Sequence, residues 1–315
     1  MTEPAGLYHS PLELPPWQPE GAGFAYTHPA TLAVWSQGTG KQHLAMMLSA
    51  VLHEDDRIDR TVVTCEAGKV DDVILDEFGQ FTDLEVGEWS GRVGGEHPQV
   101  VVVSYEKARA DICEFKPSSR AVLRDGPLTE FLAAQRVLLV LDEPQRLGKR
   151  SSGLHRTQQH LINGVLRKRR VFGSEIHTRV LGMTATTVTT GPTSHYNIGR
   201  IIAPELVGTV ADFERDYVRS WSPFRPGQPT AFKNLSPTDA PRDPDVVPLS
   251  ARLAPITHRV RKTDPEVAPF FPTFDEQKPT VVQLSELHME FIRAIYDEFA
   301  DRGPDDDGAL WNAVR

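Results

Sequence analysis

The sequence predicts an α/β fold in which a parallel sheet is flanked by helices. Between residues 30 and 190, short and almost continuously apolar runs alternate with stretches of helical periodicity. Strands buried on both faces of a parallel sheet have this composition, because helices cover both sides. The alternation of such strands with helices is typical of one sheet joined by helical crossovers. The 315 residues are enough for a large buried core and for about two domains.

Five segments are predicted as strands because each is short, rich in β-branched residues and nearly free of polar side chains. They are residues 30–35, 61–65, 100–104, 137–142 and 178–184. Residues 41–53 and 155–169 have helical patterns and are predicted to be crossover helices.

The composition changes after about residue 220. Residues 222–248 are rich in proline, which cannot donate to a sheet ladder or continue a helix, so an extended linker or insertion is expected there. Residues 284–299 carry apolar side chains on one helical face and are predicted to be a helix. We therefore expect an α/β lobe over 1–220, a proline-rich linker or insertion over 221–250, and a helical extension over 251–315.

A candidate phosphate-binding loop, Ser36-Gln37-Gly38-Thr39-Gly40-Lys41-Gln42, follows the first predicted strand and opens a helix. Its glycines would let backbone N–H groups approach phosphate oxygens, the helix N-terminus adds a favourable dipole, and Lys41 would reach the β- and γ-phosphates. The match to G-x-x-x-x-G-K-[ST] is imperfect, since Trp35 takes the first position and Gln42 the last. The alternative is a glycine-containing turn that binds no ligand.

An acidic pair, Asp142 and Glu143, ends the fourth predicted strand. Ligands of open α/β sheets bind at the carboxyl ends of strands. In phosphate-loop NTPases such an Asp holds Mg²⁺, usually through water, and the Glu positions and deprotonates the attacking water. The alternative is that Asp142-Glu143-Pro144 only caps the next helix, which is less favoured with a phosphate loop about 100 residues upstream.

The overall charge and the cysteine content exclude several classes of protein. The 34 Lys and Arg against 43 Asp and Glu give a net charge of −9, so contact with nucleic acid requires a local basic patch. Two cysteines, Cys65 and Cys113, cannot build a disulfide scaffold, and no Cys/His spacing matches a zinc site. No signal-peptide pattern and no membrane-spanning apolar run is present. We expect a soluble intracellular protein, cytoplasmic or nucleoid-associated, without a membrane partner.

Six segments resemble, in order, the motifs of the first RecA-like motor lobe of superfamily 2 helicases and translocases, and most closely the Swi/Snf-like branch. They are residues 14–21 (LPPWQPEG), 38–41 (GTGK), 64–66 (TCE), 103–106 (VSYE), 142–145 (DEPQ) and 184–186 (TAT). The resemblance covers about residues 12–299 and includes the basic stretch 258–262. It implies a RecA-like P-loop NTPase fold, with ATP and Mg²⁺ as cofactors and DNA as partner.

The resemblance also assigns roles to individual residues. The residues that it assigns to adenine and phosphate binding are Gln18, Gln37, Gly38, Thr39, Gly40, Lys41 and Gln42. The catalytic set is Lys41, Asp142 and Glu143, with Asp142 holding Mg²⁺ through water. Gln145, Thr184 and Thr186 would couple the nucleotide state to DNA.

Contacts with DNA are expected at two places. Ser104 and Tyr105 match the strand-end turn that follows the DNA path in this superfamily. The stretch 146–179 holds nine basic residues and one acid, a local charge of +8, and Lys149 and Arg150 are its candidate contacts. Such contacts grip phosphates without specifying sequence, so little sequence preference is expected. The alternative is a solvated basic helix face.

Three departures from the superfamily pattern matter. Gln42 replaces the Mg²⁺-ligating Thr, the segment 64–66 lacks the usual proline, and the chain ends at Arg315, where a second lobe would begin. That lobe supplies an arginine finger, worth about 10³–10⁵ in kcat in related NTPases. We therefore expect an ATP-dependent DNA helicase or translocase lobe that is weak or inactive alone and needs a second motor lobe, in another chain or missing from this one.

Two other functions remain open from the sequence. The first is a non-hydrolysing module that uses the same fold to bind DNA or a protein, which Gln42 and the missing lobe favour. The second is a different phosphate-loop enzyme, such as a nucleotide kinase, which the segment around Gln18 and the Thr184-Ala185-Thr186 element disfavour.

Overall fold

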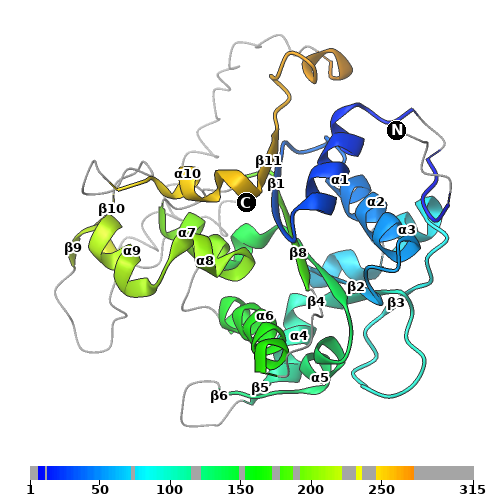
Figure 1. The fold of residues 1–315 in the computed structure, drawn as a ribbon, viewed down its shortest axis with the longest axis horizontal. Coiled ribbons are helices and arrows are strands. Elements are labelled where there is room, and N and C mark those ends of the chain that lie inside the picture. The colour runs from blue at the N-terminus through cyan, green and yellow to red at the C-terminus, as the bar shows by residue number, and fades with distance from the viewer. Residues whose placement is uncertain are drawn as a thin grey trace, which may run out of the picture. The chain divides into compact units, whose positions relative to one another are not determined.

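A seven-stranded, fully parallel sheet forms the centre of the protein (Figure 1). The computed structural model describes residues 6–10, 13–71, 75–114, 122–148, 153–171, 178–186, 192–221, 232–235 and 246–272. The strand order is β11-β1-β8-β7-β2-β4-β3. The strands are β1 (Ala30–Trp35), β2 (Arg60–Cys65), β3 (Val86–Glu88), β4 (Val100–Ser104), β7 (Val137–Asp142), β8 (Arg179–Thr184) and β11 (Thr257–Val260).

The five predicted strands are all present, with ends within one residue of the predicted ones. Every residue of β4, β7 and β8 is buried, as expected for central strands covered by helices on both faces. The α/β class with a parallel sheet is confirmed.

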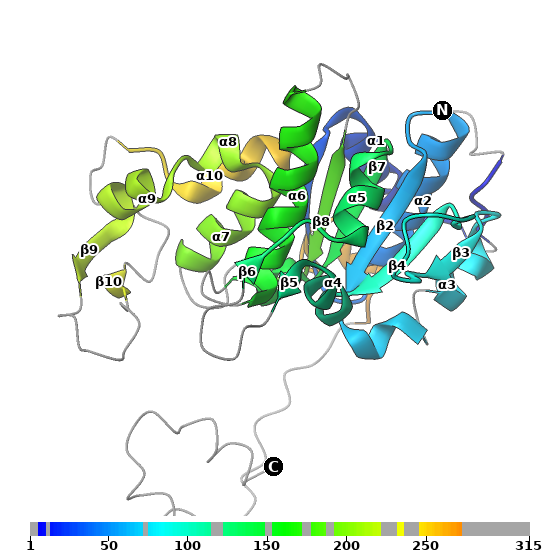
Figure 2. The same ribbon diagram turned by 90° about the horizontal axis from the view of Figure 1, so that it is seen from below.

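Helices cover both faces of the sheet (Figures 1 and 2). One face carries α1 (Trp17–Thr27), α2 (Lys41–Glu54) and α3 (Leu75–Phe81), and the other carries α4 (Tyr105–Ile112), α5 (Pro127–Ala133), α6 (Gly153–Val171) and α7 (Pro192–Ile202). The helices predicted over 41–53 and 155–169 correspond to α2 and α6. Shorter elements are α8 (Pro204–Val207), α9 (Val210–Tyr217), α10 (Leu249–Leu253), β5 (Cys113–Glu114) and β6 (Val122–Leu123). None of the helices in the described part of the chain is long and apolar enough to cross a membrane.

The region after residue 220 differs from the prediction in two elements. β11 lies where a helical extension was expected, and it pairs with β1, so the expected boundary at 250 falls inside the compact unit Met1–Phe270. β9 (Val218–Trp221) and β10 (Phe232–Leu235) form an antiparallel ribbon, although residues 222–248 were expected to form no ladder. β10 can pair because it lies in a proline-free gap between Pro229 and Pro237. The helix predicted over 284–299 lies outside the described residues.

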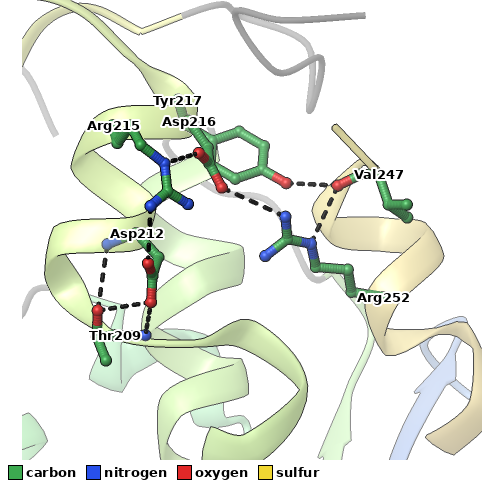
Figure 3. A network of polar contacts seen from close by, with 7 residues as sticks. All are labelled: Thr209, Asp212, Arg215, Asp216, Tyr217, Val247 and Arg252. Atoms are coloured by element: carbon green, nitrogen blue, oxygen red, sulfur yellow. Dashed lines mark hydrogen bonds and ion pairs between the residues drawn. The ribbon is translucent and has the colours of Figure 1, made fainter. Parts of the chain in front are cut away.

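A polar network ties the chain before the proline-rich segment to the chain after it (Figure 3). The Tyr217 hydroxyl and the Arg252 Nε both donate to the Val247 carbonyl, at 2.7 and 3.1 Å. Asp216, whose side chain is 5% exposed, accepts from Arg215 and Arg252. Thr209 and Asp212 cap α9 reciprocally. The network fastens α10 to α9, and the chain then re-enters the sheet as β11.

The parallel register brings functional positions to one edge. β1 pairs with β8, β8 with β7, and β7 with β2. The carboxyl ends of these strands therefore meet, which places the phosphate loop, Thr184, Asp142 and the residues that follow Cys65 at the same edge of the sheet.

Candidate nucleotide-binding site

The loop from Ser36 to Gly40 has the backbone conformation that its glycines allow. Gly38 and Gly40 have φ values of +82° and +86°, which other residues rarely adopt. A Cβ atom at Gly40 would lie 2.1 Å from Gln18 Nε2. The Thr39 hydroxyl donates to the Ser36 carbonyl at 2.7 Å and closes the turn. Gln37 is exposed and Gln42 is half-buried in the first turn of α2.

Lys41 faces the acidic pair. Its ammonium donates to the Trp35 carbonyl at 3.3 Å and lies 3.7 Å from Glu143 Oε1, with only 11% of the side chain exposed. The ends of β1 and β7 therefore bring the loop lysine and the predicted water-positioning carboxylate together.

Helix α1 closes the loop from the other side. Trp17 Nε1 and Gln18 Nε2 both donate to the Thr39 carbonyl, at 3.0 and 3.2 Å. Gln18 is only 6% exposed. Its Oε1 is buried and accepts no hydrogen bond from the described residues. A buried acceptor without a partner is costly, so this atom is available to a ligand donor beside the loop.

Glu143 begins a hydrogen-bonded chain that leads away from the phosphate loop. It has a φ of +50°, a strained conformation of the kind that occurs at functional sites. Its Oε2 accepts from Gln145 Nε2 at 2.7 Å, and Gln145 Oε1 accepts from the Thr184 hydroxyl at 2.7 Å. Thr186 N donates to Thr184 Oγ1 at 3.0 Å. The three residues predicted to couple nucleotide to DNA are thus linked to Glu143.

The alternative role for the acidic pair, capping of the next helix, is not what the structure shows. The short 3₁₀ helix η3 (Pro144–Leu147) follows Glu143, but no side-chain hydrogen bond caps it. The Glu143 carboxylate points instead to Lys41 and Gln145.

A residue that the sequence did not single out, Lys69, binds Asp142. Lys69 ends the short 3₁₀ helix η1 (Ala67–Lys69) after β2, and its ammonium lies 2.8 Å from Asp142 Oδ2. Burial raises the pKa of Asp142, and Lys69 partly offsets this effect. Desolvation lowers the pKa of Lys69, but the hydrogen bond to Asp142 and the charges of Asp142 and Glu143 together outweigh this effect and leave the pKa raised. Lys69 therefore stays charged at neutral pH.

The residues fit Mg²⁺ poorly in this arrangement. Asp142 is paired with Lys69, and Gln42 lacks the hydroxyl that ligates the ion in P-loop proteins. In the described part of the chain, no group of three or more His, Cys, Asp or Glu side chains could hold a metal ion. The expected assignment of Mg²⁺ to Asp142 through water therefore requires Lys69 to move away.

Glu77 makes stability depend on pH near this site. Burial and the Asp142 charge raise the pKa of Glu77 to about 7. A raised carboxyl pKa favours the folded state below the unfolded value, and this contribution is lost as pH rises through about 7. We expect Glu77→Gln to stabilise the protein at pH 8 relative to wild type, with a smaller difference at pH 5. Urea unfolding gives the free energy of unfolding of both proteins at each pH. An equal difference between variant and wild type at pH 5 and pH 8 would contradict this prediction.

The structure describes two of the four residues predicted to contact DNA, and both are buried. Ser104 is largely buried, and its hydroxyl accepts from Lys107 N at the start of α4. Tyr105 is 1% exposed and donates to the Asp142 carbonyl at 2.7 Å. Its position supports Asp142, so the predicted DNA contact of this buried side chain lacks support. Lys149 and Arg150 lie outside the described residues.

Two other members of the basic stretch 146–179 have protein partners. Arg146 pairs with Glu66 at 2.8 Å. Arg179 is buried and donates to backbone carbonyls of α1. The local charge available to a phosphate backbone is therefore smaller than the sequence count of +8 indicated.

A basic cleft lies beside the loop, at the carboxyl ends of β1, β8 and β11. Its volume is about 270 Å³, and it is lined by Val34, Ser36, Ala185, Thr186, Arg259, Val260 and Arg261. Arg259 and Arg261 are exposed, and neither forms an ion pair with another described residue. Ser36 N donates to the Val260 carbonyl at 2.9 Å, which fixes β11 against the loop. The resemblance pointed to this basic stretch but gave it no role.

Comparisons with known proteins identify the fold and the family. No curated protein matches the chain. The structure is similar to a Sulfolobus solfataricus SWI2/SNF2 ATPase core in complex with dsDNA, with a TM-score of 0.54, 14% identity, and coverage of 99% of this chain and 58% of that one. It is also similar to the Sulfolobus solfataricus SWI2/SNF2 ATPase core domain, with a TM-score of 0.52, 13% identity, and coverage of 86% and 49%. The chain thus spans about half of these proteins, and the likeness confirms the predicted fold.

A family model described as "Type III restriction enzyme, res subunit" matches residues 22–189, more than half of the 315 residues. The matched range includes the phosphate loop, the acidic pair and the Thr184-Ala185-Thr186 element. The chain therefore belongs to the family of the type III restriction enzyme res subunit, with the fold of a first motor lobe of superfamily 2.

Proposed function

We propose that the chain is the ATP-binding lobe of a DNA-dependent ATPase of the helicase or translocase type. The observation that carries the proposal is the position of Lys41. Its ammonium lies 3.7 Å from Glu143, at the end of a loop in which Gly38 and Gly40 have positive φ values. A cation, a loop of N–H donors and a carboxylate converge on one point, as phosphoryl transfer to water requires.

Nucleotide binding follows from the side chains around the loop. The β- and γ-phosphates would replace the Trp35 carbonyl as the partner of Lys41. The unpaired Gln18 Oε1 would accept a hydrogen bond from the exocyclic amine of adenine. Glu143, held by Gln145, would position the attacking water. Asp142 is paired with Lys69, so it would be available to Mg²⁺ through water only after Lys69 had moved away.

Coupling to DNA would use the series of hydrogen bonds that links Glu143 to Thr186. Gln145 and Thr184 link the water-positioning carboxylate to Thr186, which lines the basic cleft. A backbone phosphate in that cleft would contact Arg259 and Arg261, so the nucleotide site and the DNA would share one hydrogen-bonded path. One structurally similar protein is a complex with dsDNA, and this supports the proposed partner.

Turnover of ATP with and without duplex DNA tests the proposal. We expect slow hydrolysis by the chain alone, because the arginine finger comes from a second lobe in related motors. Duplex DNA together with that lobe is expected to raise the rate, and Glu143→Gln is expected to remove the increase while ATP still binds. A rate that Glu143→Gln leaves unchanged would contradict the proposed role of Glu143.

A non-hydrolysing module is the second candidate function. The Lys69–Asp142 ion pair and the glutamine at position 42 favour it, since both disturb the usual ion site. DNA binding without any DNA-stimulated turnover, even in the presence of a second lobe, would support this function instead.

A further inference from the structure

The ammonium of Lys69 lies against the carboxylate at the end of β7. Strand β2 pairs with β7 in parallel, with Thr64 opposite Leu141. A residue shortly after β2 is therefore brought to the end of β7, and Lys69 reaches Asp142 Oδ2 at 2.8 Å. Asp142 is the carboxylate that would otherwise hold the divalent ion.

Burial explains why this pair is firmly held. The Asp142 side chain is 6% exposed, whereas that of Lys69 is 37% exposed. A buried carboxylate needs a counter-ion, and removing one partner of such a pair leaves an uncompensated charge. An ammonium carries three donors, so Lys69 keeps hydrogens for a further acceptor after it has bound Asp142. The side chain is partly exposed, and its remaining hydrogens can be given to a phosphate oxygen.

The other usual ligand of the ion, the last residue of the loop pattern, is also changed. The first turn of α2 carries Gln42, whose side chain has no hydroxyl. A primary amide offers a neutral oxygen, and Mg²⁺ prefers near-ideal octahedral oxygen ligands while it gives up its water reluctantly. Both usual ligand positions of Mg²⁺ are therefore changed. Position 42 has lost a hydroxyl, and Asp142 is already paired with a cation.

We propose that Lys69 takes the place of the divalent cation, so that this chain binds ATP without Mg²⁺. The inference rests on the proposed ATP-binding function and goes beyond it, because it names the group that compensates phosphate charge. Lys69 binds both Asp142 and the phosphates in this proposal, and the ATP site is complete when no metal is present.

Equilibrium binding of ATP in excess Mg²⁺ and in excess EDTA tests the inference. We expect the wild-type Kd to differ by less than about threefold between the two buffers. Lys69→Met is expected to weaken binding in EDTA by about tenfold or more, the effect of losing a charge-assisted hydrogen bond. The double variant Gln42→Thr/Lys69→Met, which regains the hydroxyl and frees Asp142, is expected to bind ATP tightly only with Mg²⁺.

Lys107→Met is the matched control. Lys107 also pairs with a carboxylate at 2.8 Å, Glu88 Oε1, and its side chain is 39% exposed, close to the value for Lys69. It lies on α4 and should leave ATP binding unchanged in both buffers. Lys69→Arg keeps the charge, and it is expected to retain binding in EDTA if Lys69→Met fails to fold.

The outcomes separate this inference from the proposed function. A wild-type affinity that falls tenfold or more in EDTA would overturn the inference alone, because the chain would still bind ATP. Unchanged binding by folded Lys69→Met in EDTA would also overturn it. No ATP binding by the wild type in either buffer would overturn the proposed function and the inference with it.

Discussion

Replacing Lys41 by alanine is expected to weaken ATP binding by 100-fold or more, roughly the loss of two charge-assisted hydrogen bonds. Lys41 is the cation at the end of the loop, 89% of its side chain is buried, and its ammonium lies against Trp35 O and Glu143. Alanine would leave the phosphates facing the Glu143 carboxylate without a counter-charge. Titration of a fluorescent ATP analogue, followed by competition with ATP, measures the change.

Gln37→Ala is the control for this substitution. Gln37 was predicted to bind phosphate as part of the loop, but its side chain is exposed and alanine keeps its backbone N–H, so this change tests whether loss of any side chain in the loop disturbs binding. We expect less than a threefold effect. If Lys41→Ala and Gln37→Ala reduced binding equally, the loop would not hold phosphates through its lysine.

Replacing Trp35 by alanine is expected to lower the free energy of unfolding by about 3–5 kcal/mol, the range for truncating a large buried aromatic residue. Trp35 is fully buried, and its Nε1 donates to His258 Nδ1 at 3.0 Å. A Cβ atom at Gly21 would lie 2.3 Å from the Trp35 ring, so α1 packs directly on it. The substitution would leave a cavity between α1 and the strands β1 and β11, at the base of the loop.

Trp35→Phe provides the comparison for Trp35→Ala. It keeps an aromatic ring but loses the hydrogen bond to His258, so we expect a cost of about 1–2 kcal/mol. Urea unfolding of both variants and the wild type gives the three values. An alanine variant as stable as the phenylalanine variant would contradict a packing role for Trp35, which takes the place of the first glycine in the loop pattern.

The central strands could be predicted because their sequences are determined by burial alone. Val100–Ser104 and Val137–Asp142 are covered on both faces, which requires an apolar side chain at nearly every position. β11 could not be found in this way. It forms one edge of the sheet, and its exposed Arg259 and half-buried His258 give the sequence of a basic loop. β3, the other edge strand, has three residues and was too short to give a pattern.

The candidate site could be predicted only where a motif names a residue. Lys41, Asp142 and Glu143 belong to motifs, and the structure places Lys41 beside Glu143 at the end of β7. Lys69 belongs to none, and its closeness to Asp142 depends on the pairing of β2 with β7. A strand order assumed from the fold class would have placed the two strand ends side by side. Tyr105 is the opposite case. Its motif predicted a contact with DNA, but its side chain is buried.

The pairing of β1 with β11 also determines when the phosphate loop can be completed during synthesis. Trp35 and His258 are 223 residues apart in the sequence. At 5–20 residues per second, the ribosome needs roughly 10–45 s to add the missing strand. Until then β1 has an open edge, whose unpaired N–H and C=O groups are a template for pairing with another chain. A chain shortened to the predicted boundary at residue 220 would keep that edge permanently, and aggregation during expression is the expected result.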